Sequence, residues 1–128
     1  MTQENSNQLL FKDLCVRLPY HIRVKVWLKD GTTEEGTLDL EHNYGDVLRD
    51  AFYYNKIVKI KPYLFPMSSM TETQKNEYQY ITERWMYDSS YSISDSIDWL
   101  NKNHFDYRGL IPMGLAIDAT GLNIYYNS

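Results

Sequence analysis

A short segment near the C-terminal end combines groups that could perform acid–base chemistry. The stretch NHFDYRG, residues 103–109, holds His104, Asp106 and Arg108. A histidine oriented by a carboxylate, here Asp106 or Asp98, can act as a general base. No nucleophile or oxyanion-binding group accompanies them, so we favour a structural role: His104 ends a helix, and Asp106 pairs with Arg108 in a turn. We therefore predict a protein that is not an enzyme, with a site at His104 and Asp106 as the alternative.

A strand with one basic face is the best candidate for a binding site. In HIRVKVWLKDG, residues 21–31, apolar residues alternate with cations and a tryptophan, and IVKIKPYL, residues 57–64, adds two more lysines. Interleaved cations and an aromatic ring can hold phosphates and stack a base. The alternative is a solvated outer face whose lysines discourage edge-to-edge pairing. The candidate nucleic-acid site consists of Arg23, Lys25, Trp27, Lys29, Lys59 and Lys61.

Aromatic residues suggest a second kind of surface. The chain has 12 tyrosines, 4 phenylalanines and 3 tryptophans, together 15% of its residues. Tryptophan, tyrosine and arginine anchor many protein interfaces. Trp99, Tyr107 and Arg108 are therefore the candidate protein interface, and ordinary packing of these side chains is the alternative.

Composition argues against several classes of site. The three histidines show no metal-ligand spacing, and the six glycines are scattered, so we predict no metal and no cofactor. Cys15, the one cysteine, is expected to be a buried, inert thiol among leucines. Residues 12–61 carry nine Lys or Arg against eight Asp or Glu, whereas residues 62–128 carry four against eight. This balance is far less basic than that of dedicated nucleic-acid-binding proteins.

The location of the protein follows from what the sequence lacks. No stretch of 18 apolar residues is present, so we expect no membrane span. The first residues show no signal-peptide pattern, and a single cysteine suits a reducing compartment. We expect a cytoplasmic protein.

Periodicity and turn signals place these groups on a small set of elements. Residues 22–29 and the returning stretch 32–43 are expected to form a hairpin around Asp30-Gly31, a favoured turn pair. A strand is expected over 57–64, after a weaker one at 47–54. Capping patterns at Ser69, Thr71 and Ser92 predict helices over about 70–87 and 92–103. A short helix or turn is expected over 9–18. Short strands are expected at 115–117 and 123–126, and residues 1–8 should be frayed.

Two longer segments carry a resemblance. KPYLFPMSSMTETQ, residues 61–74, and IDWLNKNHFDYRGLIPMGLAI, residues 97–117, together resemble a group of short uncharacterised proteins encoded by gut bacteria and their phages or mobile elements. The match covers residues 9–118. The resemblance implies a phage-related accessory protein rather than a housekeeping enzyme, and it carries over no functional residues.

A weaker resemblance concerns the hairpin. VKVWLKDGTTEEGTLDLE, residues 24–41, is similar to the opening hairpin of Sm-like or SH3-like barrels. Sm-like proteins bind RNA through loop residues, but the later strands show no matching positions. The resemblance therefore implies a barrel without implying a binding site.

These observations predict one α+β domain spanning residues 1–128. A small bent antiparallel sheet or SH3-like barrel occupies 20–66, two helices lie within 70–103, and a tail covers 104–128. The function expected first is a non-enzymatic accessory protein that binds another protein. Weak RNA or DNA binding through the basic strand face is the alternative.

Overall fold

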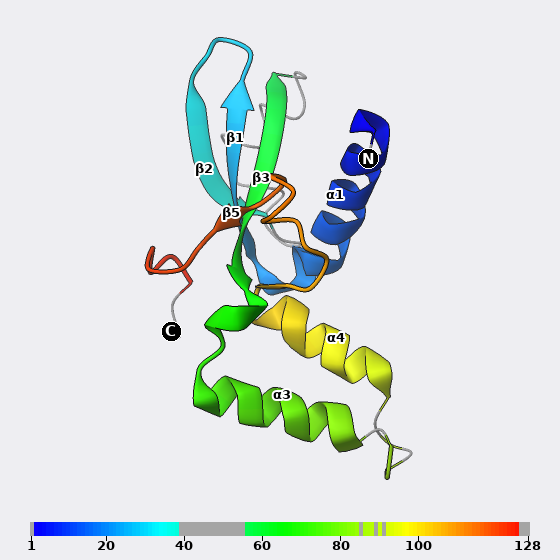
Figure 1. Ribbon diagram of the computed structural model, residues 1–128. Helices are drawn as coiled ribbons and strands as arrows, with labels where there is room; N and C mark the ends of the chain where they lie inside the picture. The colour runs from blue at the N-terminus through cyan, green and yellow to red at the C-terminus, as the bar shows by residue number, and fades with distance from the viewer. Residues whose placement is uncertain (1, 39–55, 85, 89, 91, 126–128) are drawn as a thin grey trace.

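The computed structural model describes residues 2–38, 56–84, 86–88, 90 and 92–125 (Figure 1). The strand predicted at 47–54 lies outside these ranges, as does residue 85 of the helix predicted over about 70–87.

An N-terminal helix, α1, spans Gln3–Arg17 and continues into a 3-10 turn, η1, at Leu18–Tyr20. It begins where the side chain of Thr2 accepts a hydrogen bond from the backbone N–H of Asn5, and Glu4 complements the helix dipole in the first turn. Residues 3–8, which we expected to be frayed, lie within this helix. The spacing of the leucines did not reveal the first turns of this helix, because the residues that follow the cap are polar.

Three antiparallel strands form the main sheet: β1, Ile22–Leu28; β2, Thr33–Leu38; and β3, Ile57–Pro66. The predicted hairpin between β1 and β2 is confirmed. Its turn is held by Asp30, whose carboxylate accepts hydrogen bonds from the backbone N–H and the hydroxyl of Thr32, and Gly31 has a φ of 89°. A glycine suits this position because other residues rarely adopt a positive φ.

The sheet is open, so the barrel alternative is wrong. Two short strands, β4 at Phe105–Asp106 and β5 at Ile117–Asp118, both pair with β3 in parallel. In the ranges described, β2 pairs only with β1, and no strand returns to close the sheet. The 104–128 segment thus contributes strands to the sheet, and the pairing is mixed rather than wholly antiparallel.

A helical hairpin extends from the end of β3 (Figure 1). After the 3-10 turn η2, Met67–Ser69, come α3, Glu72–Arg84, and α4, Ile93–Lys102. Thr71 and Gln74 exchange side-chain-to-backbone hydrogen bonds at the start of α3, and Ser92 and Asp95 form a capping box at α4. Both predicted helices are present. The first ends at Arg84 rather than near residue 87.

The core lies on one face of the main sheet. Ile22, Val24 and Val26 are fully buried there, and the leucines of α1 pack against them. The opposite face of β1 and β3 carries the cations singled out from the sequence. Among the described helices, none combines the length and apolar character needed to cross a membrane.

Candidate nucleic-acid interface

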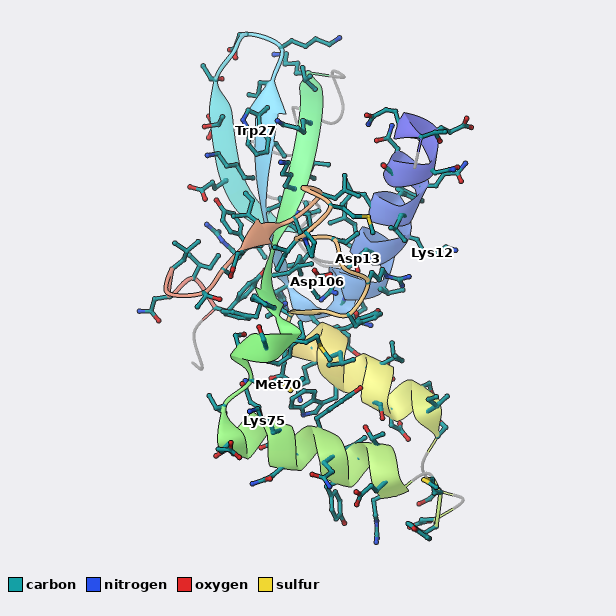
Figure 2. All side chains as sticks on the ribbon, in the orientation of Figure 1. Lys12, Asp13, Trp27, Met70, Lys75 and Asp106 are labelled. Carbon is teal, nitrogen blue, oxygen red and sulfur yellow. The ribbon has the colours of Figure 1, made fainter. Side chains whose placement is uncertain are left out.

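Three lysines converge on the indole ring of Trp27. The Nζ atoms of Lys59, Lys25 and Lys61 lie 4.3, 5.3 and 5.7 Å from the ring centroid. Strand register causes this arrangement: Lys25 lies opposite Lys61, and Trp27 lies opposite Lys59, so all four side chains share one face. Figure 2 shows Trp27 on the three-stranded sheet, away from α1. We call these four residues the Trp27 cluster.

Among the described residues, no carboxylate forms an ion pair with the Trp27 cluster. Within the described ranges, Lys25, Lys59 and Lys61 form no ion pair. Glu35 lies opposite Lys25 on the neighbouring strand, and its carboxylate accepts a hydrogen bond from the Tyr63 hydroxyl. Burial and this carboxylate raise the pKa of Tyr63 to about 12, so the hydroxyl keeps its proton. The three lysine charges are therefore available to an external anion.

A hollow borders the cluster. Trp27, Lys59 and Lys61 are among the residues that line a cavity of about 670 Å³, together with Leu10 and Leu115. Its mixture of apolar side chains and lysines suits a planar aromatic group that carries a negative charge nearby.

The remaining predicted residues lie at the two ends of this face. Arg23 donates a hydrogen bond from its guanidinium to the Thr37 hydroxyl and lines a separate polar pocket. Lys29 is exposed in the hairpin turn. The adjacent Asp30 has a lowered pKa, chiefly because the Thr32 hydroxyl donates to it, so its negative charge marks the limit of the basic surface.

The candidate protein interface is occupied by intramolecular contacts. Trp99 stacks on Phe105 with ring centroids 5.7 Å apart and contacts Tyr78 at 5.6 Å. The Tyr107 hydroxyl donates to the side-chain oxygen of Asn101. Packing of the helical hairpin on β4 accounts for these aromatic side chains.

Arg108 belongs to a charged network that ties the tail to α1. Its Nε lies 3.1 Å from Oδ1 of Asp13, and Oδ2 of the same carboxylate lies 2.8 Å from Nε of Arg17. The side chains of Asp13 and Arg17 are both fully buried. Arg17 also donates to the Phe105 carbonyl. Figure 2 shows Asp13 at the end of α1 near the sheet and the tail. The predicted Asp106–Arg108 pair is wrong, because Arg108 reaches Asp13 instead. The i,i+4 spacing of Asp13 and Arg17 was the one available sequence signal.

The acid–base alternative gains no support from the geometry. Asp106 accepts hydrogen bonds from the backbone N–H groups of Leu110 and Ile111, which closes the turn after β4. His104 stacks on Tyr125 with ring centroids 3.7 Å apart. Burial, and then the nearby Arg17 charge, lower the pKa of His104 to about 3, so the ring is neutral at physiological pH. No hydrogen bond within the described ranges joins His104 to a carboxylate.

Tyr125 is a positioning residue that sequence reasoning missed. Its hydroxyl accepts a 2.8 Å hydrogen bond from the backbone N–H of Arg23 and donates one of 2.7 Å to the carbonyl of Tyr63. It bridges β1 and β3 next to their last paired residues, Val24 and Pro62. The sequence pattern predicted a strand at 123–126, but the described residues there form none.

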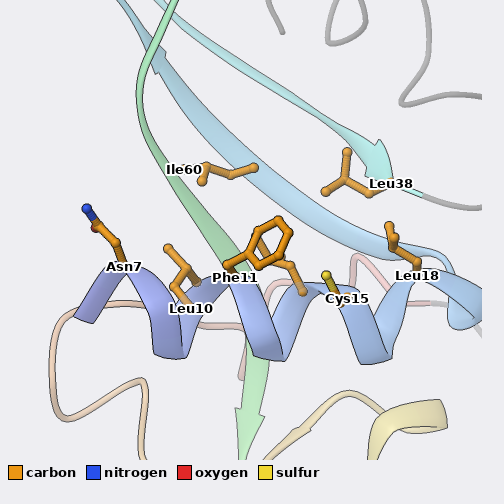
Figure 3. Close-up of a pocket in the computed structure, with 8 residues that line it drawn as sticks. Asn7, Leu10, Phe11, Cys15, Leu18, Leu38 and Ile60 are labelled. Carbon is orange, nitrogen blue, oxygen red and sulfur yellow. The ribbon is translucent and has the colours of Figure 1, made fainter. Parts of the chain in front are cut away.

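An apolar pocket lies between α1 and the sheet (Figure 3). Leu10, Phe11 and Leu18 face Leu38 and Ile60 across it. Cys15 also lines this pocket and is exposed, so the prediction of a buried thiol is wrong.

The described residues contain no group of three or more His, Cys, Asp or Glu side chains that could hold a metal ion. Comparison of the chain with protein-family models, curated proteins and solved structures gives no match, so the candidate site rests on its own geometry.

Proposed function

We propose that this protein binds single-stranded RNA or DNA through the Trp27 cluster. The observation that carries the proposal is the convergence of three lysines on one indole ring, with no ion pair to a carboxylate in the part of the chain that the structure describes. Each lysine contacts a phosphate oxygen, and Trp27 offers its ring to an unpaired base.

Electrostatics favours this use of the surface. Three cations around one ring repel each other, and a phosphate placed between them relieves that repulsion while releasing counterions from the nucleic acid. The acidic helical hairpin limits long-range attraction, which agrees with weak rather than tight binding.

Single strands suit the cluster better than duplexes. Stacking on a protein ring requires a base free of its duplex partner, and such stacking contributes about 1–3 kcal/mol per base. The cavity beside Trp27 provides room for such a base.

A binding measurement with matched lysine variants tests the proposal. Fluorescence anisotropy of labelled single-stranded RNA and DNA should show Lys59→Ala binding several-fold more weakly than the wild-type protein. Lys75→Ala removes an exposed lysine on α3, outside the cluster, and should bind like the wild type. Equal binding by the two variants, or no binding by the wild-type protein at low salt, contradicts the proposal.

A protein-binding accessory function is the second candidate. Exposed apolar side chains on and beside the helical hairpin favour it, and Tyr87 is 82% exposed. Among the residues described there, Tyr80, Met86, Ile93 and Ile97 are also exposed. The phage or mobile-element setting rests on the resemblance of the two longer sequence segments. Affinity capture from host lysate tests this candidate: a partner retained by the wild type should be lost with Ile93→Asp and kept with Lys25→Glu.

A further inference from the structure

A second pocket lies where the sheet meets the helical hairpin. It has a volume of about 520 Å³ and is built by residues from β1, β2, β3, α3, the end of α4 and the tail. This size exceeds what a simple inorganic anion needs and falls in the range of small-molecule sites. Because so many separate segments line it, the pocket depends on the complete fold.

The described lining residues include two cations and no carboxylate. Arg23 and Lys102 both line the pocket, and no Asp or Glu is among its described lining residues. Lys102 is exposed and forms no ion pair within the described ranges. An arginine and a lysine without a competing acid favour a phosphate group.

The pocket also contains a buried polar atom without a partner. His104 lines it, is only 8% exposed, and its Nδ1 has no hydrogen-bond partner in the ranges described. Buried polar atoms are nearly always hydrogen-bonded, so an unpartnered ring nitrogen calls for a donor or acceptor from elsewhere. The neutral ring can pair with either kind of group, depending on its tautomer.

Groups suited to a nucleobase complete the lining. Gln74 and Asn103 present side-chain amides. The Gln74 oxygen accepts from the Thr71 N–H and the Asn103 nitrogen donates to the Trp99 carbonyl, which leaves the Gln74 nitrogen as a donor and the Asn103 oxygen as an acceptor for the edge of a base. Tyr20 and Phe65 add aromatic rings. Phosphate-binding cations, amides and rings together point to one class of ligand.

We propose that this pocket binds a phosphorylated nucleoside. Arg23 and Lys102 contact its phosphate, and Gln74, Asn103 and the unpartnered His104 nitrogen read its base. The ligand is either a free mononucleotide or the phosphorylated end of a strand. Arg23 belongs to both the pocket and the basic strand face, which makes the second source possible. The inference goes beyond the proposed function, because a free mononucleotide can bind while the Trp27 cluster is empty.

Contacts within the protein hold the backbone around the pocket. His21 and His104 both line it with positive φ values, 56° and 63°, which non-glycine residues adopt at a cost in free energy. Tyr125 holds the tail against His104 and bridges β1 to β3. A preformed pocket loses less entropy when it binds a ligand.

Isothermal titration calorimetry of the full chain tests the proposal, with AMP, GMP, CMP, UMP, adenosine and inorganic phosphate as ligands. At least one mononucleotide should bind at least tenfold more tightly than both adenosine and inorganic phosphate. Lys102→Ala should weaken that binding about tenfold or more, whereas Lys75→Ala should leave it unchanged. Gln74→Glu should abolish it, since glutamate keeps the capping role at α3 but places a negative charge in the pocket.

A second arm separates the two sources of the ligand and the two proposals. If the end of a strand is the ligand, a 5′- or 3′-phosphorylated oligonucleotide should bind more tightly than its unphosphorylated form, and Lys102→Ala should remove the difference. If a free mononucleotide is the ligand, the two oligonucleotides should bind equally. The proposal is overturned if no mononucleotide binds and phosphorylation of the strand end makes no difference, if inorganic phosphate binds as tightly as the mononucleotides, or if Lys102→Ala has no effect. In that case the Trp27 cluster proposal still holds if unphosphorylated strands bind to the wild-type protein and bind more weakly to Lys59→Ala.

Discussion

Trp27 lies directly opposite Lys59 across the β1–β3 pair, with the lysine Nζ 4.3 Å from the centre of the indole ring. This pair lies at the centre of the Trp27 cluster, and the lysines at 25 and 61 occupy the next positions on the same face. The arrangement joins a stacking surface to several positive charges over a short distance. The proposed binding of single strands depends on this relationship.

Removing the indole should weaken binding of single strands. Trp27→Ala loses about 1–3 kcal/mol of base stacking, which corresponds to roughly a 5- to 150-fold lower affinity. Trp27→Phe retains an aromatic face and should lose less. Anisotropy titrations with a labelled oligonucleotide measure both variants, and circular dichroism confirms that each is folded. Equal affinities for wild type and Trp27→Ala would exclude stacking on this ring.

Breaking the buried ion pair should destabilise the protein strongly. Asp13→Ala leaves Arg17 buried without its carboxylate, and such changes cost about 3–5 kcal/mol. Arg108→Ala removes a partner whose side chain is 22% exposed, so its effect should be smaller. Urea denaturation gives the free energy of unfolding for each variant. If Arg108→Ala lowers the free energy of unfolding as much as Asp13→Ala does, the unpaired Arg17 charge does not explain the loss of stability in Asp13→Ala.

Stability should fall as the pH drops from 7 to 5, in part because of His104. Its pKa is lowered to about 3 in the folded protein, against about 6.5 for an unperturbed histidine, so the unfolded chain binds more protons between these values. The contribution of neutral His104 to the free energy of unfolding is fully present above pH 6.5. It is lost as the pH falls toward 3, by at most about 1.4 kcal/mol per pH unit.

His104→Asn isolates this contribution. Asparagine tolerates the positive φ of 63° at this position and does not titrate. The decrease in the free energy of unfolding from pH 7 to pH 5 should therefore be smaller in the variant than in the wild type. Identical decreases in the two proteins would show that His104 does not contribute to the loss of stability between pH 7 and pH 5.

Removing the Tyr125 hydroxyl should loosen the joint between β1 and β3. Tyr125→Phe leaves the backbone N–H of Arg23 and the carbonyl of Tyr63 without this partner, at a cost of about 1–3 kcal/mol. Amide hydrogen exchange followed by NMR should show faster exchange at Arg23. Unchanged exchange there, with the protein folded, would mean that the hydroxyl does not hold the two strands together.

Local signals predicted the local elements well. Asp30-Gly31 predicted the hairpin because few other pairs accept that turn, and the caps at Thr71 and Ser92 predicted both later helices. The N-terminal helix was underestimated because its first turns rely on the cap at Thr2 rather than on apolar spacing.

Long-range pairing was beyond the reach of sequence patterns. Alternation predicted that Lys25 and Trp27 share a face and suggested Lys59 as a neighbour, but the register that pairs Lys59 with Trp27 appears only in the folded sheet. Arg108 finds its carboxylate 95 positions away in α1 rather than in its own turn. The barrel prediction failed for a similar reason, since a hairpin alone does not determine whether a sheet closes.

The salt dependence of strand binding tests the central claim most directly. Three lysine–phosphate contacts predict a slope of about −2 in a plot of log affinity against log salt concentration, or a roughly 20-fold loss between 50 and 200 mM salt. Lys59→Ala should reduce the slope to about −1.4, whereas Lys75→Ala should leave it at about −2. A wild-type slope near zero, or the same slope for wild type and Lys59→Ala, would contradict phosphate binding by the Trp27 cluster.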